Sequence, residues 1–311
     1  MHCVDSRRIL CVGLAALDIV NTCESYPKED NDYRAISQRW QTGGNACNTA
    51  TVLKEIGMES EFFGTMSCGF QADFILQQMS DRGIHYDNCI CHKDCGTPTS
   101  CVVLSLQTGT RTIVHHRNDL PELEVADFEK VDLSKYGWIH FEGRRNEQEI
   151  IKMIDIVDKF NVLQPFAKKI KVSVELERPR EDLLQLLNKG DVVFISKDFA
   201  RSRGFSSPAE TVKSLHSKTK SGAVLICAWG EEGADGIGPD GAVKHSDAYP
   251  PKNVIDTLGA GDTFIAGVIA CLWKNSSLQD TLNFACSLAG VKCGMQGYSG
   301  LAEAVQYQQQ E

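Results

Sequence analysis

Short apolar runs and amphipathic stretches alternate along most of this chain of 311 residues. Runs with the length and composition of buried strands are ILCVGL, SEFFGTM, WIHFEG, KIKVSVELE, DVVFIS and AVLICAW. Stretches with the apolar spacing of helices are NACNTATVLKEIG, QADFILQQMSDRG, EQEIIKMIDIVDKF, PREDLLQLLN and PAETVKSLHSK. This order predicts an α/β fold, in which a doubly wound, mostly parallel sheet carries helices on both faces.

Two segments break this alternation. Residues 20–41 are largely polar and include the alternating stretch YRAISQRWQ, and residues 97–117 alternate like a hairpin with a turn at Thr108-Gly109. We expect the two segments to form a small sheet that covers the end of the larger one as a lid. Residues 1–311 are predicted to be a single domain, with a tail at 302–311 that frays.

Composition and charge exclude several classes of function. A formal net charge of −9 argues against a nucleic-acid surface, and no apolar run is long enough to cross a bilayer. Many of the 13 cysteines lie inside apolar runs, which indicates small buried side chains in a reducing compartment, and we predict the cytosol. The cluster CICHKDC lacks zinc-site spacing, and we interpret it as a strand end and a polar turn.

A set of residues suited to holding several hydroxyl groups lies early in the chain. Asp18 is expected at the carboxyl end of the first strand, and TGGNACN, Thr42–Asn48, opens a helix. Gly44 permits close backbone approach, and Asn45 and Asn48 are three residues apart, so both amides can face one ligand. The alternative is a glycine turn with an asparagine cap.

The stretch DTLGAGDTF, Asp256–Phe264, combines an anion site with a carboxylate. Gly259, Ala260 and Gly261 precede an apolar helix, whose first N–H groups and dipole favour an anion such as a phosphoryl group in transfer. Asp262 has the wrong charge for a phosphate pocket, but it suits a general base that accepts the proton of an attacking hydroxyl. The alternative is a tight loop with an aspartate at the helix start.

Two further positions could contact a nucleotide. Arg111 on the predicted hairpin could bind phosphate oxygens bidentately, although a solvated hairpin arginine is the favoured interpretation of this residue taken alone. In CAWGEEGAD, Gly230 and Gly233 would let the backbone approach a nucleotide, and Glu231 and Glu232 could reach Mg²⁺ through water. The alternative there is a loop with two surface glutamates.

TGGNACN, followed by Gly57, and DTLGAGD together resemble the two signatures of the ribokinase-like (PfkB) carbohydrate kinases. Within that family the chain is most similar, over 7–298, to the branch that phosphorylates ketohexoses. The stretches that carry this similarity are YPKEDNDYRAISQRWQTGGNACN, DFEKVDLSKYGWIHFEGR, VSVELERPRE and CAWGEEGADGIGPDG. The resemblance implies a three-layer core with a small sheet as a lid, and transfer of the γ-phosphate of MgATP to the 1-hydroxyl of D-fructose.

The resemblance also implies roles for the matching positions. Asp262 is the expected base, and the sugar is expected to contact Asp18, Gly44, Asn45, Asn48 and Asp262. The phosphates of ATP are expected at Arg111, at the loop Gly230, Glu231, Glu232 and Gly233, and at the turn Gly259, Ala260 and Gly261 beside Asp262. The resemblance further implies a homodimer formed through the lid.

The chain departs from the family pattern at FISKDFA and at Thr110, and two functional alternatives stay open. Lys197 and Ala200 of FISKDFA stand where many members carry an Asn-x-x-Glu motif, so no metal ligand is named, and the need of some members for K⁺ is left open. A related kinase acting on ribose, adenosine or another sugar is one alternative. The other is a sugar-binding protein without catalysis, against which the intact Asp262 argues.

Overall fold

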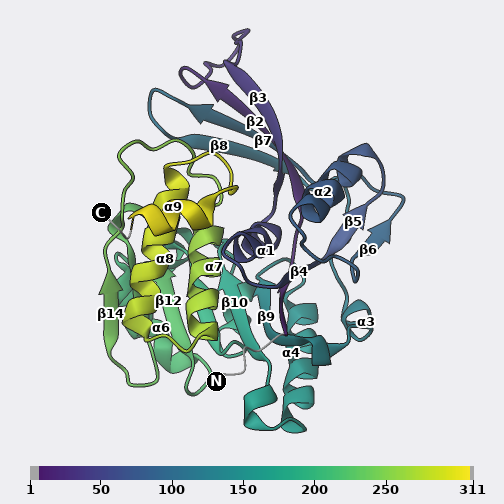
Figure 1. Cartoon of the computed structure of the whole chain (residues 1–311), viewed down its shortest axis with the longest axis vertical. Helices are drawn as coiled ribbons and strands as arrows, with labels where there is room; N and C mark the ends of the chain where they lie inside the picture. Colours follow the sequence, from purple (N-terminus) through teal and green to yellow (C-terminus); the bar gives the residue numbers. More distant parts are fainter. Residues whose placement is uncertain (1–6, 309–311) are drawn as a thin grey trace.

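The computed structural model describes residues 7–308 and contains a central sheet of eight strands with helices on both faces (Figure 1). The strands in spatial order are β14 (Val243–Ser246), β13 (Ala234–Ile237), β12 (Val224–Ala228), β11 (Val192–Ile195), β10 (Lys171–Leu176), β9 (Tyr136–Glu142), β1 (Arg8–Val12) and β4 (Ser60–Phe63). The pairs β12–β13 and β13–β14 are antiparallel, and the remaining pairs are parallel. The doubly wound α/β fold expected from the sequence is therefore confirmed.

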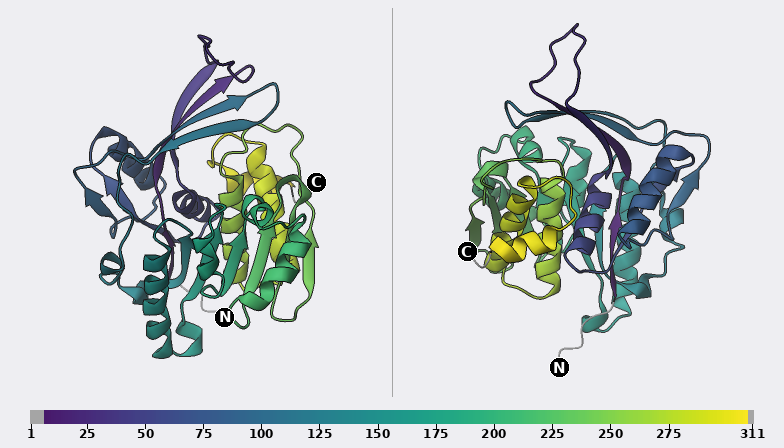
Figure 2. Two further views of the ribbon diagram at one scale, coloured as in Figure 1. Left: turned by 180° about the vertical axis from the view of Figure 1, so that it is seen from behind. Right: turned by 45° about the horizontal axis from the view of Figure 1, so that its top comes forward.

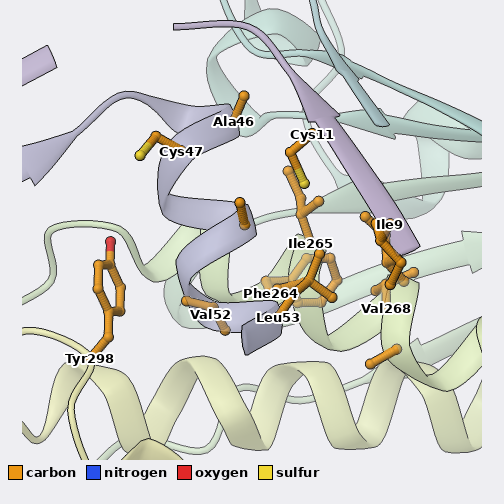
Figure 3. Close-up of a cluster of buried hydrophobic side chains, with 14 of the residues drawn as sticks. Ile9, Cys11, Ala46, Cys47, Val52, Leu53, Phe264, Ile265, Val268 and Tyr298 are labelled. Carbon is orange, nitrogen blue, oxygen red and sulfur yellow. The ribbon is translucent and has the colours of Figure 1, made fainter. Parts of the chain in front are cut away.

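Two apolar cores lie on the two faces of this sheet. The helices that pack into one core are α1 (Asn45–Glu55), α2 (Phe70–Asp81), α7 (Ala260–Trp273), α8 (Leu278–Cys293) and α9 (Leu301–Gln308). Those of the other core are α3 (Val125–Phe128), α4 (Glu147–Val162), α5 (Lys197–Ser202) and α6 (Pro208–Leu215). Strands such as β9 and β11 are buried along their whole length, which explains their continuous apolar runs. Figure 3 shows side chains of α1, β1 and α7 that pack together in the first core.

A second sheet of four strands projects from one end of the main sheet (Figure 2). Its order is β3 (Ser37–Gly43), β2 (Ala16–Cys23), β7 (Thr99–Ser105) and β8 (Arg111–His116). We call it the lid sheet. The segments expected at 20–41 and 97–117 thus contribute strands to it, and β2 begins earlier, at Ala16. A short pair of strands, β5 (Thr65–Ser67) and β6 (Ile90–His92), flanks α2.

Some local expectations differ from the structure. The stretch PREDLLQLLN forms only the short 3₁₀ helix η3 (Asp182–Leu186), one of five with η1 (Leu133–Lys135), η2 (Phe166–Lys168), η4 (His216–Lys218) and η5 (Gly230–Glu232) among the described residues. The tail expected to fray from 302 is helical to Gln308, because Leu301 and Val305 are buried in the first core. Residues 309–311 lie outside the described part.

Candidate active site

Asp18 lies within the lid sheet, which corrects its expected place at the end of the first strand. β1 ends at Val12, and Asp18 is the third residue of β2, opposite Gln41 of β3. The side chain is only 5% exposed, and burial raises its pKa to about 6, a shift that a hydrogen bond to Ser100 opposes. The lid sheet therefore places the buried Asp18 carboxylate at the edge of the main sheet.

The turn before α7 combines a left-handed glycine with the start of a helix. Gly259 caps the helix with a left-handed φ of 77°, and a Cβ there would lie 1.8 Å from the Tyr298 hydroxyl oxygen, so only glycine fits. Gly261 faces open space, since a Cβ at that position would meet no neighbouring atom within 4 Å. Helix-starting N–H groups have no partner within the helix and can bind an anion above this turn, and in this structure the N–H of Ala260 donates to the carbonyl oxygen of Thr257 at 3.3 Å.

Asp262 lies in the first turn of α7, buried and beside α1. Nδ2 of Asn48 donates a hydrogen bond to its Oδ2 at 2.7 Å. Burial raises the pKa of Asp262 to about 8, the bond from Asn48 lowers it, and the charges of Glu177, Glu142 and Asp18 raise it. A carboxylate with such a pKa is suited to accept a proton near neutral pH.

The start of α1 places two of the predicted sugar-binding amides at the same site. Gly44 has a φ of 95°, and a Cβ there would lie 2.2 Å from the carbonyl oxygen of Leu14. Asn45 follows it, and its Nδ2 lies 3.2 Å from Oε1 of Glu175 and 3.2 Å from Oε2 of Glu177. The Asn45 amide thus points at carboxylates in this structure, whereas Asn48 points at Asp262.

Three glutamates that the sequence analysis missed complete the acidic surroundings. Glu142 ends β9, Glu175 lies in β10, and Glu177 follows it. Oε2 of Glu142 accepts hydrogen bonds from the backbone N of Leu14 (2.9 Å) and of Ala46 (3.2 Å), so it fixes both the end of β1 and the start of α1. A carboxylate at the carboxyl end of a buried parallel strand, as in WIHFEG and VSVELE, was the available signal.

Glu175 is buried among other acidic groups. Burial raises its pKa well above its usual range, and the charges of Glu177 and Asp262 raise it further. The neutral acid is therefore favoured at Glu175, which limits the negative charge that gathers around Asp262.

Arg111 and the loop after β12 reach this edge of the sheet from different sides. Arg111, at the start of β8, donates from Nη1 to Oγ1 of Thr257 at 2.8 Å, just before the Gly259 turn. The residues Gly230–Glu232 form η5 directly after β12. Because β12 runs parallel to β11, β10 and β9, its carboxyl end lies at the edge where Glu142 and Asn45 are found.

Lys197, which the resemblance places where many family members carry an asparagine, contacts the loop after β12. Its Nζ lies 2.8 Å from Oε1 of Glu231, 3.7 Å from Oε1 of Glu232 and 3.4 Å from the carbonyl oxygen of Trp229. The two glutamates expected near Mg²⁺ are thus paired with a lysine in this structure. Among residues 7–308, no group of three or more His, Cys, Asp or Glu side chains has the arrangement of a metal site.

Within the same residues, no helix combines the length and the apolar character that crossing a membrane requires.

Comparison with known proteins relates the whole chain to one family. The sequence model described as "pfkB family carbohydrate kinase" matches residues 6–304. Ketohexokinase of Mus musculus is 48% identical over 298 residues, which cover 96% of this chain and 100% of the mouse protein. The 1-phosphofructokinase of Borreliella burgdorferi is 24% identical and covers 91% of this chain and 90% of its own.

Solved structures show the same fold at low sequence identity. Ribokinase of Giardia lamblia superposes with a TM-score of 0.83 at 16% identity, covering 97% of this chain and 98% of its own. Arabidopsis thaliana ribokinase, solved in complex with ribose and ATP, gives a TM-score of 0.79 at 20% identity, with 97% and 98% coverage.

Proposed function

Since this chain belongs to the pfkB family of carbohydrate kinases, we propose that it transfers the γ-phosphate of ATP to the 1-hydroxyl of D-fructose. The observation that carries the proposal is the buried Asp262 in the first turn of α7, directly beside the open Gly259–Gly261 turn and hydrogen-bonded to Asn48. Fructose is proposed as the acceptor because the 48% identical mouse relative is a ketohexokinase.

The chemistry follows from the order of groups along the start of α7. Ionised Asp262 accepts the proton of the 1-hydroxyl, and the resulting nucleophilic oxygen attacks the γ-phosphorus. The bond from that phosphorus to the β,γ-bridging oxygen breaks, so ADP leaves. The N–H groups of Gly259, Ala260 and Gly261 stabilise the negative charge on the phosphoryl oxygens during transfer.

The remaining predicted residues bind the sugar at the edge between the two sheets. Asp18 approaches from the lid sheet, while Gly44, Asn45 and Asn48 approach from the start of α1. When the sugar binds, its hydroxyls replace Glu175 and Glu177 as partners of the Asn45 amide. Both sheets thus contribute polar groups, so the sugar binds best when the lid sheet lies close to the main sheet.

The phosphates of ATP are assigned to Arg111, to the loop Gly230–Gly233 and to the turn at Gly259. Mg²⁺ bound with ATP neutralises part of the phosphate charge, and we assign it no ligand from the chain because Glu231 and Glu232 pair with Lys197. We assign no K⁺ site either. The oxygens of Asp256 near the turn already have a cationic partner, since Nζ of Lys292 lies 2.9 Å from its carbonyl and 3.4 Å from its Oδ2.

We further propose that the protein is a cytosolic homodimer whose lid sheets contact each other. Support comes from apolar side chains on the face of the lid sheet that points away from the main sheet, such as Val114, which is 68% exposed. The dimer would also cover part of the unpaired edges of the lid sheet.

The test is ADP release by the purified protein with MgATP and fructose, other ketohexoses, ribose, adenosine or no acceptor. Phosphorus NMR of the product locates the new ester. We expect turnover with fructose and formation of the 1-phosphate. Turnover with ribose or adenosine alone would establish the related-kinase alternative, and fructose binding without turnover would establish a sugar-binding protein.

A further inference from the structure

Two arginines of the lid sheet bind the segment that leads into the Gly259 turn. Nη2 of Arg39, in β3, lies 3.0 Å from Oδ2 of Asp256. Nη1 of Arg111, in β8, donates to Oγ1 of the next residue, Thr257, at 2.8 Å. Arg39 is absent from the site expected from the sequence, and the proposed reaction gives it no contact with substrate. Its contact therefore needs a separate explanation.

Strand register places both arginines on the inner face of the lid sheet. Arg39 is opposite Val20, which is opposite Val102 of β7, and Arg111 is opposite Leu104, two residues further along β7. Residues directly opposite or two apart in a sheet share a face. Val20, Val102 and Leu104 form a small buried cluster with Leu258 of the turn segment. The inner face of the lid sheet thus packs directly on residues 256–258.

Asp256 is also held from the main domain, independently of the lid sheet. Its side chain is 2% exposed, and its Oδ1 accepts a hydrogen bond from the backbone N of Leu258 at 2.9 Å. Nζ of the fully buried Lys292, in α8, lies 3.4 Å from Oδ2 of Asp256 and 2.9 Å from its carbonyl oxygen. Lys292 already neutralises this carboxylate, so Arg39 brings a second cation and the group of three carries one net positive charge.

Contacts continue from Lys292 to the turn itself. Nζ of Lys292 lies 5.5 Å from the ring centre of Tyr298, which is buried beside α1 (Figure 3). The hydroxyl of Tyr298 abuts Gly259, where a Cβ would be 1.8 Å away. A continuous series of contacts therefore joins Arg39 on the lid sheet to the backbone that offers N–H groups to the phosphoryl group.

The geometry points to Arg39 as a positioning residue that makes the anion-binding turn depend on the lid sheet. With the lid sheet close, Arg39 fixes Asp256 and adds positive charge near the transferring phosphoryl group. With the lid sheet displaced, the turn segment keeps Lys292 but loses Arg39. Sugar binding, which engages Asp18 of the lid sheet, would thereby favour a formed anion site only when an acceptor is present. This inference rests on the proposed kinase function.

The experiment compares Arg39→Gln with the wild type and with Arg34→Gln, a control at an exposed arginine of the β2–β3 connection. We expect Arg39→Gln to lower kcat by about 10-fold, the range of coupling through such networks. The dissociation constant of the sugar without nucleotide should change by less than about 3-fold. Affinity for ADP with aluminium fluoride and sugar, which mimics the transferring phosphoryl group, should fall by the same factor as kcat. Arg39→Lys should restore part of both losses, and Arg34→Gln should change neither.

If Arg39 had a merely structural role, Arg39→Gln would lower thermal stability, kcat and sugar affinity together. The loss of affinity for ADP with aluminium fluoride would then be no larger than the loss of affinity for the sugar alone. That outcome, or an unchanged kcat in Arg39→Gln, would overturn the inference. Failure of the proposed function would look different, because the wild type itself would not phosphorylate fructose. If the wild type phosphorylated another acceptor, the same comparison with that acceptor would still decide the role of Arg39.

Discussion

Nδ2 of Asn48 lies 2.7 Å from Oδ2 of Asp262 and donates a hydrogen bond to it across the interface of α1 and α7. The bond favours the ionised carboxylate, while burial favours the protonated form and brings the pKa to about 8. Asn48 therefore has two roles in the proposed mechanism. It contacts the sugar, and it sets the pH at which Asp262 can act as a base.

Asp262→Asn should remove the base without disturbing the fold of the site. The amide keeps the size of the side chain, so fructose and ATP should bind with nearly normal affinity. We expect kcat to fall by about 10²-fold or more, the usual scale for a lost general base. Calorimetric binding and steady-state kinetics measure the two quantities separately. Near-normal turnover would remove Asp262 from the role of base.

The rate should rise with pH up to about 8 in the wild type. A base acts only when ionised, and Asp262 ionises above its pKa of about 8, so kcat/KM should fall about tenfold per pH unit below it. Asn48→Ala removes the donor that stabilises the carboxylate and so raises the pKa of Asp262. The rising limb of the plot of kcat/KM against pH should therefore shift to higher pH by about one unit. If the rising limb stayed at the same pH in Asn48→Ala, or shifted to lower pH, the ionisation of another group would control the rate.

Arg111→Ala should weaken the interaction with ATP or its transition state by about 10-fold or more, because bidentate bonds to charged oxygens are lost. Thr257→Val is the matched control, since it removes only the 2.8 Å contact that Arg111 makes in this structure. We expect it to change KM for ATP by less than about 3-fold. A change confined to fructose affinity in Arg111→Ala would contradict its assignment to the phosphates.

Contiguous motifs made the turn and the start of α1 predictable from sequence. Gly259 and Asp262 lie within four residues, so local spacing alone places the carboxylate beside the turn. Glu142 and Glu175 were missed because they lie in separate strands, and only the sheet brings them together. Sequence spacing carries no information about which strand ends are neighbours.

The sequence analysis placed Asp18 wrongly for a different reason. The run ILCVGLAALDIV looks continuous, yet β1 ends at Val12 and β2 begins at Ala16. Between them, Gly13 lets the Glu142 carboxylate come close, since a Cβ there would lie 2.4 Å from its Oε2. The contact that separates the two strands is thus made by a residue more than a hundred positions away. Arg39 was missed for the same reason, because its partner Asp256 is distant in sequence.

Val114→Glu should convert the proposed dimer into monomers. Ile113 is opposite the buried Val102 on the inner face, so the next residue, Val114, lies on the outer face of the lid sheet. In a two-fold symmetric interface the new glutamate would be buried twice, which costs more than an exposed apolar residue contributes. Val162→Glu is the control, because Val162 is 80% exposed but lies at the end of α4. Light scattering should give the monomer mass of 34.3 kDa for Val114→Glu and twice that for Val162→Glu and the wild type. A Val114→Glu protein that keeps the dimer mass would place the interface elsewhere, and a monomeric wild type would refute the dimer.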